Sequence, residues 1–212
     1  MQVIISMPQA IKTESKAIKK AKGLIRPQTG MFRAGEAIKA GVHPRTLYEM
    51  RDKGVIERMG RGMYRLSAMP PLGNPDLATV AMKIPKGVIC LISALAYHEL
   101  TTEIPHEIYL ALPRGMEPPR LDYPPLRVFW FGAAAFKEGI EQHDVDGIAV
   151  QVYNPEKTLA DCFKYRNKIG LDVALEALKF YRRKRFQVDE LMRYARICRV
   201  EKVMRPYVEA LL

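Results

Sequence analysis

The chain has 212 residues, enough for one large domain or for two small ones with a core each. Hydrophobic residues make up 48% of it, as in ordinary folded proteins, and the longest apolar run, Gly87 to Tyr97, is about half the length that a membrane span needs. Three isolated cysteines and an N-terminus without a basic stretch argue against a disulfide scaffold and against a signal peptide. We therefore expect a cytoplasmic protein that does not bind membranes.

The net charge is +11, and it is distributed unevenly along the chain. Residues 1–66 hold 14 Lys and Arg against 5 Asp and Glu, a net charge of +9, and residues 162–212 hold 13 against 6, a net charge of +7. Residues 67–161 between them hold 7 against 12, a net charge of −5. Basic clusters attract polyanions through counterion release, so both ends of the chain are candidates for nucleic-acid binding. The alternative is a basic protein whose charges are only solvated.

Apolar periodicity and turn residues predict a compact series of elements in the basic N-terminal part. Helices are expected over residues 9–21, 34–40 and 44–53, and extended segments over residues 31–32, 55–59 and 63–66. The first helix is amphipathic, with lysines on its outer face, and should stop near Gly23. Pro44 suits the first turn of the third helix, and Gly54 suits the C′ position after it. The last two segments, separated by "GRG", form a hairpin.

Two helices joined by a turn and followed by a hairpin are the element order of a winged helix-turn-helix. In that fold the second helix enters the major groove of DNA, and the hairpin tip, called the wing, lies on the backbone. Arg45 and Thr46 begin that helix and are the expected base contacts, because Arg can bind guanine O6 and N7 and Thr can contact a thymine methyl group. The other expected DNA-binding residues are Arg33, His43, Tyr48, Arg51, Lys53, Arg58 and Arg61. A winged helix that contacts protein is the alternative.

The segment 67–76, "SAMPPLGNPD", has the proline content of a linker. Beyond it, helices are expected near residues 76–84 and from residue 93, strands within 106–113, 125–132 and 147–154, and helices over 155–166, 171–184, 188–197 and 200–211. The predicted fold class is α+β. Residues 1–66 form the basic helix and the winged helix-turn-helix, and residues 77–212 form an α+β domain with a small mixed sheet in 77–153 and an all-helical end in 155–212.

Motifs of enzymes are missing from the sequence. His98-Glu99 and His106-Glu107 lack the second histidine of H-E-x-x-H, and "HDVDG" from His143 to Gly147 suits a polar loop better than a metal site. The acid-x-Lys triplet of many nucleases occurs only at residues 14–16, in the first predicted helix, and phosphate-loop and dinucleotide motifs are absent. We expect no catalytic residue, no metal and no cofactor. Lys157 and Asp161, four apart on a helix, are expected to form a salt bridge, with a catalytic pair as the alternative.

From Thr29 to Leu212 the chain resembles the AbiEi family, the antitoxins of type IV toxin–antitoxin and abortive-infection systems. The resemblance is carried by "RGMYRL", "ISALAYHEL", "IYLALPRG", "VYNPEKTLADCFKYRNKIG" and the closing "RPYVE". These motifs consist mostly of packing and turn residues, so they indicate the fold and the lineage more than a site. The resemblance makes residues 77–212 the expected antitoxin domain.

The resemblance implies a transcriptional autorepressor in which the winged helix binds inverted repeats of double-stranded DNA in its own promoter. It also implies that the C-terminal domain counters a cognate AbiEii-type nucleotidyltransferase toxin, without a stable complex between the two. The chain would act as a monomer or a weak dimer. Seven basic residues near the C-terminus are either a second nucleic-acid surface or a solvated helix face: Arg182, Arg183, Lys184, Arg185, Arg193, Arg196 and Arg199.

Two other function classes remain open at this stage. One is a nuclease or nucleotidyl-handling defence enzyme that its winged helix targets to DNA. The other is an adaptor whose basic ends bind an acidic protein.

Overall fold

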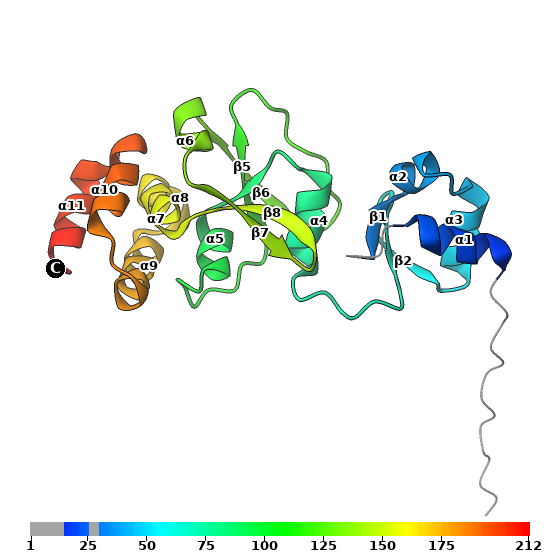
Figure 1. Cartoon of the computed structure of the whole chain (residues 1–212). Coiled ribbons are helices and arrows are strands. Elements are labelled where there is room, and N and C mark those ends of the chain that lie inside the picture. The colour runs from blue at the N-terminus through cyan, green and yellow to red at the C-terminus, as the bar shows by residue number, and fades with distance from the viewer. Residues whose placement is uncertain (1–14, 26–29) are drawn as a thin grey trace, which may run out of the picture. The chain divides into compact units, whose positions relative to one another are not determined.

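The structure is a computed structural model that describes residues 15–25 and 30–212 (Figure 1). It divides into two compact units, residues 1–71 (unit 1) and residues 72–212 (unit 2). Each unit has a hydrophobic cluster of its own. The units are therefore described one at a time.

In its described residues, unit 1 combines three helices with a three-stranded antiparallel sheet. Its elements are α1 (Lys16–Leu24), β1 (Met31–Arg33), α2 (Ala34–Lys39), α3 (Pro44–Asp52), β2 (Ile56–Gly60) and β3 (Met63–Leu66). The strand order is β1-β3-β2. The core is formed by Ile18 of α1, Phe32 of β1, Leu47 and Met50 of α3, and Ile56 of β2. Helix, turn, helix and hairpin thus follow one another as the sequence predicts.

Two predictions for unit 1 need correction. Ser15 has an extended backbone, and its Oγ accepts a hydrogen bond from the Ile18 N–H at 3.4 Å. It is an N-cap, so α1 begins after it, and the helix predicted over 9–21 is wrong at this residue; residues 9–14 lie outside the described part. The helix also continues through Gly23. The predicted hairpin of β2 and β3 is confirmed, and β1 adds a third strand to it by pairing with β3, from Met31 opposite Arg65 to Arg33 opposite Met63.

The end of α3 confirms the prediction for Gly54. Its N–H donates to the Arg51 carbonyl at 2.9 Å, and the Val55 N–H donates to the Met50 carbonyl at 2.8 Å. Gly54 has a φ of +67°, the left-handed conformation that this helix end requires and that glycine adopts without strain. The sharp stop directs the chain from α3 into β2.

Arg65 links the sheet of unit 1 to the segment that follows β3. Its side chain is only 8% exposed; it forms an ion pair with Glu57 at 2.8 Å and donates to the carbonyl oxygens of Met69 and Pro70. At the other end of the predicted linker, the N–H groups of Gly73 and Asn74 donate to the Asp146 carboxylate at 3.0 and 3.1 Å. Most of the segment 67–76 is therefore fixed to one unit or the other.

Replacing Arg65 with methionine should lower the free energy of unfolding of unit 1 by about 1–2 kcal/mol, because several charge-assisted hydrogen bonds are lost while the carbonyl groups remain. Chemical denaturation followed by circular dichroism measures the change. Arg58→Met is the matched control, since Arg58 lies in the same sheet but is exposed, and it should change stability by less than about 0.5 kcal/mol. Equal stabilities for the two variants would contradict the role given to Arg65.

Unit 2 contains a five-stranded mixed sheet and a helical end. Its elements are α4 (Pro75–Lys83), β4 (Val88–Ile89), α5 (Leu91–Tyr97), β5 (Ile108–Pro113), β6 (Leu126–Phe131), α6 (Ala133–Lys137), β7 (Ile140–Val145), β8 (Ile148–Tyr153), α7 (Pro155–Lys164), α8 (Arg166–Ile169), α9 (Leu171–Lys184), α10 (Val188–Ile197) and α11 (Glu201–Glu209). The strand order is β6-β5-β4-β8-β7, with β5–β6 and β4–β8 parallel and the other pairs antiparallel. The α+β class is confirmed.

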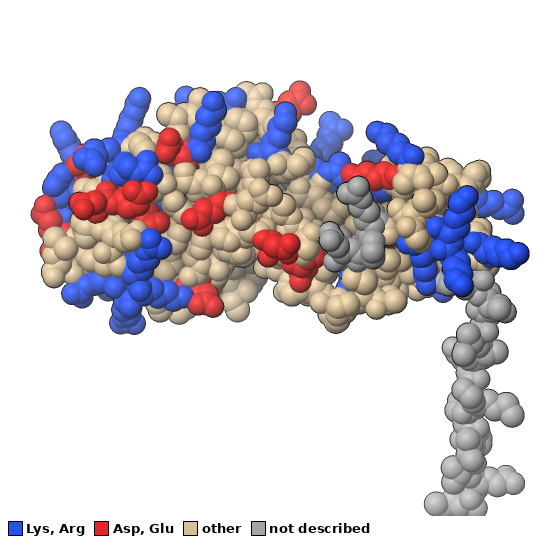
Figure 2. Space-filling model, in the orientation of Figure 1, with Lys and Arg blue, Asp and Glu red and all other residues tan. Residues whose placement is uncertain are grey.

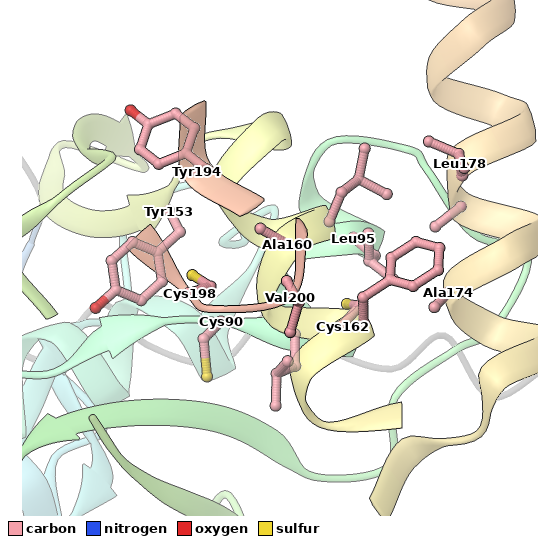
Figure 3. Packing of buried hydrophobic residues seen from close by; sticks show 14 of the residues in the cluster. Cys90, Leu95, Tyr153, Ala160, Cys162, Ala174, Leu178, Tyr194, Cys198 and Val200 are labelled. Atoms are coloured by element: carbon pink, nitrogen blue, oxygen red, sulfur yellow. The ribbon is translucent and has the colours of Figure 1, made fainter. Parts of the chain in front are cut away.

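The core of unit 2 lies where the sheet meets the helical end. Helix α7 is central to it, because it packs against α5, α9 and α10. Figure 3 shows Ala160 and Cys162 of α7 among Leu95 of α5, Leu178 of α9 and Cys198 after α10. All eight residues from Glu156 to Phe163 are buried.

The sequence prediction missed four short or polar elements in unit 2. Strand β4 has two residues, and the buried helix after it begins at Leu91 rather than near Ser93. Helices α6 and α8 have five and four residues. The polar loop predicted at "HDVDG" is wrong for His143 to Val145, which end edge strand β7; only Asp146 and Gly147 form the turn to β8.

Candidate nucleic-acid interface

Helix α3 presents one apolar face to the core of unit 1 and a polar face to solvent. Leu47 and Met50, three residues apart, are 5% and 0% exposed and anchor it. Pro44 occupies the first turn, as predicted. Since α1 and α2 both pack against it, α3 is held on two sides while its outer face stays open.

The N-terminal end of α3 carries the residues predicted to contact bases. His43 is the N-cap, and its Nδ1 accepts a hydrogen bond from the Arg45 N–H at 3.2 Å. The His43 ring thus fixes the first turn, a role that the sequence interpretation did not give it. The Arg45 side chain is exposed, and no ion pair within the described residues engages it. Thr46 beside it is half-buried. Of these residues, Arg45 is the most accessible to a ligand.

The C-terminal end of α3 is less positive than its sequence suggests. Arg51 forms an ion pair with Asp52 at 2.7 Å, and Lys53 forms one with Glu49 at 2.6 Å. The Arg51 guanidinium also lies 5.3 Å from the centre of the Tyr48 ring, whose residue is 56% exposed. A phosphate that approached Arg51 or Lys53 would meet a carboxylate as well. The strongest positive potential of α3 is therefore at its N-terminal end, where the helix dipole also favours anions.

The wing brings three of the predicted arginines to one end of the small sheet. Arg61 and Gly62 form the turn between β2 and β3, and Gly62 has a φ of +69°. Arg33 ends β1 beside this turn, since the following residue, Ala34, donates its N–H to the Gly62 carbonyl at 2.9 Å. Arg58 donates from Nε to the Gly60 carbonyl at 3.3 Å. The two ends of β3 are thus unlike: one holds buried Arg65, and the other holds half-buried Arg33 together with exposed Arg58 and Arg61.

A residue that the sequence interpretation left out lies next to the N-terminal end of α3, where the predicted base contacts lie. A small cavity of about 160 Å³ is lined by Lys20 and Leu24 of α1 and by His43 and Thr46. Lys16, Lys19 and Lys20 are all exposed on α1. Residues near 20 and 46 meet only through the tertiary packing of α1 on α3, so sequence spacing alone could not have placed Lys20 here. Lys20 joins the candidate interface.

A family model covers this part of the chain. Residues 24–67 match the AbiEi family, described as "Transcriptional regulator, AbiEi antitoxin". The resemblance predicted from the sequence is confirmed for this segment, which contains α2, α3, the wing and the end of α1. The AbiEi segment supports a DNA-binding regulator as the broad function of the chain. A search of curated proteins gave no significant match.

A solved structure extends the similarity of fold beyond the AbiEi segment. The Rv2827c protein from Mycobacterium tuberculosis aligns with a TM-score of 0.54 over 92% of this chain and 80% of that one. The sequences are 12% identical, so the likeness concerns the fold alone. Both units of the present chain therefore have counterparts in a protein of known structure.

The second basic surface expected near the C-terminus is not uniform. Lys184 forms an ion pair with Glu99 at 2.6 Å, and Arg193 forms ion pairs with Glu190 and Glu138 at 2.7 and 3.2 Å. The other five, Arg182, Arg183, Arg185, Arg196 and Arg199, are exposed and form no ion pair with any described residue. Figure 2 shows Lys and Arg over the helical end in separate groups with Asp and Glu between them. For Lys184 and Arg193 the structure favours salt bridges.

The conspicuous motif "PEKTLAD" on α7 forms a buried ion pair. Lys157 Nζ contacts Asp161 Oδ2, and both side chains are 0% exposed. Cys198 Sγ donates to Asp161 Oδ1 at 3.2 Å, and Lys157 Nζ lies 4.1 Å from the centre of the Tyr153 ring. A substrate could not reach either charge, so the predicted salt bridge is confirmed and the catalytic alternative is not supported.

Two further properties of the described residues bear on function. No group of three or more His, Cys, Asp or Glu side chains in the described ranges is placed to hold a metal ion. None of the helices described in the structure combines the length and the apolar character that crossing a bilayer requires.

Proposed function

We propose that unit 1 binds operator DNA with the N-terminal end of α3 in the major groove and that the protein represses its own promoter. The observation that carries this proposal is the exposed Arg45, without an ion-pair partner among the described residues, at the capped end of a helix within an AbiEi-matched segment. A guanidinium there can donate two hydrogen bonds to guanine O6 and N7, which only a base edge in the major groove offers.

The remaining unit 1 residues divide into two roles. Tyr48 is exposed on α3, and Thr46 is half-buried beside Arg45. Both would contact bases or sugars close to Arg45. Arg33, Arg58 and Arg61 at the wing, together with Lys20 of α1, would neutralise phosphates on either side and set the register of the helix. Arg51 and Lys53 would contribute less, because Asp52 and Glu49 already neutralise them. His43 would act through its cap on the first turn.

A salt-titrated mobility-shift assay tests this function directly. The probes are the DNA immediately upstream of the start codon of the protein and scrambled DNA of equal length and composition. We expect a preference of about a thousandfold or more for the upstream DNA, the range that specific regulators reach. Equal, salt-sensitive affinity for both probes would contradict sequence-specific repression, since it would leave only the electrostatic attraction of a basic unit.

We further propose that unit 2 is the antitoxin part, which counters a nucleotidyltransferase toxin. The support is the resemblance of its motifs to the AbiEi family and the antitoxin description of the model that matches residues 24–67. Expression of the adjacent gene alone should arrest growth, and co-expression of this chain should restore it. Rescue should persist in Arg45→Ala, which alters only the DNA-binding end of α3. Loss of rescue in that variant would mean that protection depends on repression and not on unit 2.

A further inference from the structure

An open cavity of unit 2 lies where the sheet meets the helical end. Its volume is about 610 Å³, which falls in the range of small-molecule sites. Four basic residues from three parts of the chain line it: Arg114 after β5, Lys164 and Arg166 where α7 passes into α8, and Arg199 between α10 and α11. No Asp or Glu lines it.

The four cations lack the carboxylate partners that some other basic residues of unit 2 have. Lys184, Arg193 and Arg205 all form ion pairs with carboxylates. None of Arg114, Lys164, Arg166 and Arg199 forms an ion pair with any residue that the structure describes. Four like charges around one cavity repel one another, and an anion placed among them would remove that repulsion.

Two of these cations are held in place by hydrogen bonds, Arg114 through its backbone and Arg166 through its side chain. The Arg114 N–H donates to the Phe131 carbonyl at 3.0 Å, which ties its backbone to the end of β6. The Arg166 guanidinium donates to the Phe163 carbonyl at 2.8 Å, at the end of α7. The cavity is therefore bounded by anchored residues on both of these sides, which reduces the entropic cost of binding.

Arg199 occupies a backbone position that ordinarily selects glycine. Its φ is +60°, its N–H donates to the Arg196 carbonyl at 3.0 Å, and the Val200 N–H donates to the Ala195 carbonyl at 2.8 Å. Gly54 holds the same position after α3, and Glu99 holds it after α5. A side chain here strains the backbone. The Glu99 side chain forms an ion pair with Lys184, whereas the Arg199 side chain lines the cavity.

The rest of the cavity wall is small and apolar. Ala133, Ala134 and Ala135 of α6 lie on one part of it, and Val200 and Val203 lie on another. A ligand made only of phosphate would leave this surface unused. A cavity of about 610 Å³ has the size for a small molecule and is too small to enclose a nucleic-acid duplex.

We propose that this cavity binds a small organic polyphosphate of the size of a nucleoside di- or triphosphate. The phosphates contact Arg114, Lys164, Arg166 and Arg199, and the organic part lies against the alanines of α6 and the valines near α11. The site belongs to unit 2, so it does not depend on DNA binding by unit 1.

Calorimetric titration of the full chain with ATP, GTP and inorganic pyrophosphate tests the proposal. We expect saturable binding of a nucleotide that is tighter than that of pyrophosphate, and an affinity lower by about tenfold in Arg114→Ala and in Arg199→Gly. Arg182→Ala is the control, since it removes one exposed charge of the same unit outside the cavity and should leave the affinity unchanged within about twofold.

The Arg199→Gly variant separates a binding role from a structural one. Glycine adopts a positive φ without strain, so the melting temperature should stay the same or rise while nucleotide affinity falls. A lower melting temperature that accounts for the loss of binding would overturn the assignment of Arg199. The proposal is also overturned if no nucleotide binds at millimolar concentration, if pyrophosphate binds as tightly as ATP and GTP, or if both cavity variants bind as the control does.

Discussion

Replacing Asp161 with alanine is expected to lower the free energy of unfolding of unit 2 by about 3–5 kcal/mol, because it leaves the fully buried Lys157 ammonium without its counter-charge. Burial raises the pKa of the Asp161 carboxyl, and the neighbouring Lys157 opposes that shift. The carboxylate also accepts from Cys198, so its removal disturbs the junction between α7 and α10. Urea denaturation followed by the fluorescence of Trp130, the single tryptophan and a residue of unit 2, measures the change.

The matched control for Asp161→Ala is Glu201→Ala. Glu201 pairs with Arg205 at the same spacing of four residues, on α11, but the Arg205 side chain is 55% exposed. Loss of the Glu201–Arg205 pair should lower the free energy of unfolding by less than about 1 kcal/mol. A double variant, Lys157→Met with Asp161→Leu, should recover most of the stability lost in Asp161→Ala, since neither charge is then buried alone. Equal effects of Asp161→Ala and Glu201→Ala would show that burial does not set the energy of the pair.

Replacing Arg45 with alanine is expected to weaken operator binding by about 1–3 kcal/mol and to change binding to random DNA little. The reason is that a bidentate contact to guanine is lost only where the guanine is present. The measurement is the dissociation constant on both DNAs over a range of salt concentrations.

Arg61→Ala provides the comparison for Arg45→Ala. Arg61 lies at the wing turn, so its loss should weaken binding to both DNAs alike and reduce the salt dependence by about one charge. If both variants lost the same affinity on both DNAs, the base-contacting role of Arg45 would be wrong, and the end of α3 would only contact phosphates.

The long helices could be predicted closely because their signals are local. The bounds predicted for α9 and α10 agree with the structure, since apolar spacing and the flanking Gly170 define them. Strand β4 could not be found, because two buried residues carry no period and are extended only through their pairing with β5 and β8. Strand β7 lies at a sheet edge, has no fully buried residue and carries four polar residues in a row from Glu141 to Asp144, which resembles a loop in sequence.

The candidate interface was predictable in part. The spacing of Leu47 and Met50 gives the inward face of α3 correctly, and Glu49 and Lys53, four apart, already signal an ion pair that the charge count ignored. The position of Lys20 on the same small cavity as His43 and Thr46 depends on packing between segments about 25 residues apart. The strained backbone of Arg199 has no sequence signal, because a lone arginine after a helix is ordinary.

The three cysteines allow the opening of unit 2 to be measured by thiol labelling. Cys90, Cys162 and Cys198 are all buried in unit 2, and unit 1 has no thiol. Burial raises the pKa of each thiol, that of Cys198 to about 12. Alkylating reagents attack the thiolate, so the folded unit should resist them and react only when it opens. Labelling rates in the wild-type chain therefore give the opening equilibrium of unit 2 without an engineered probe. Unit 1 has no cysteine and contributes no labelling signal.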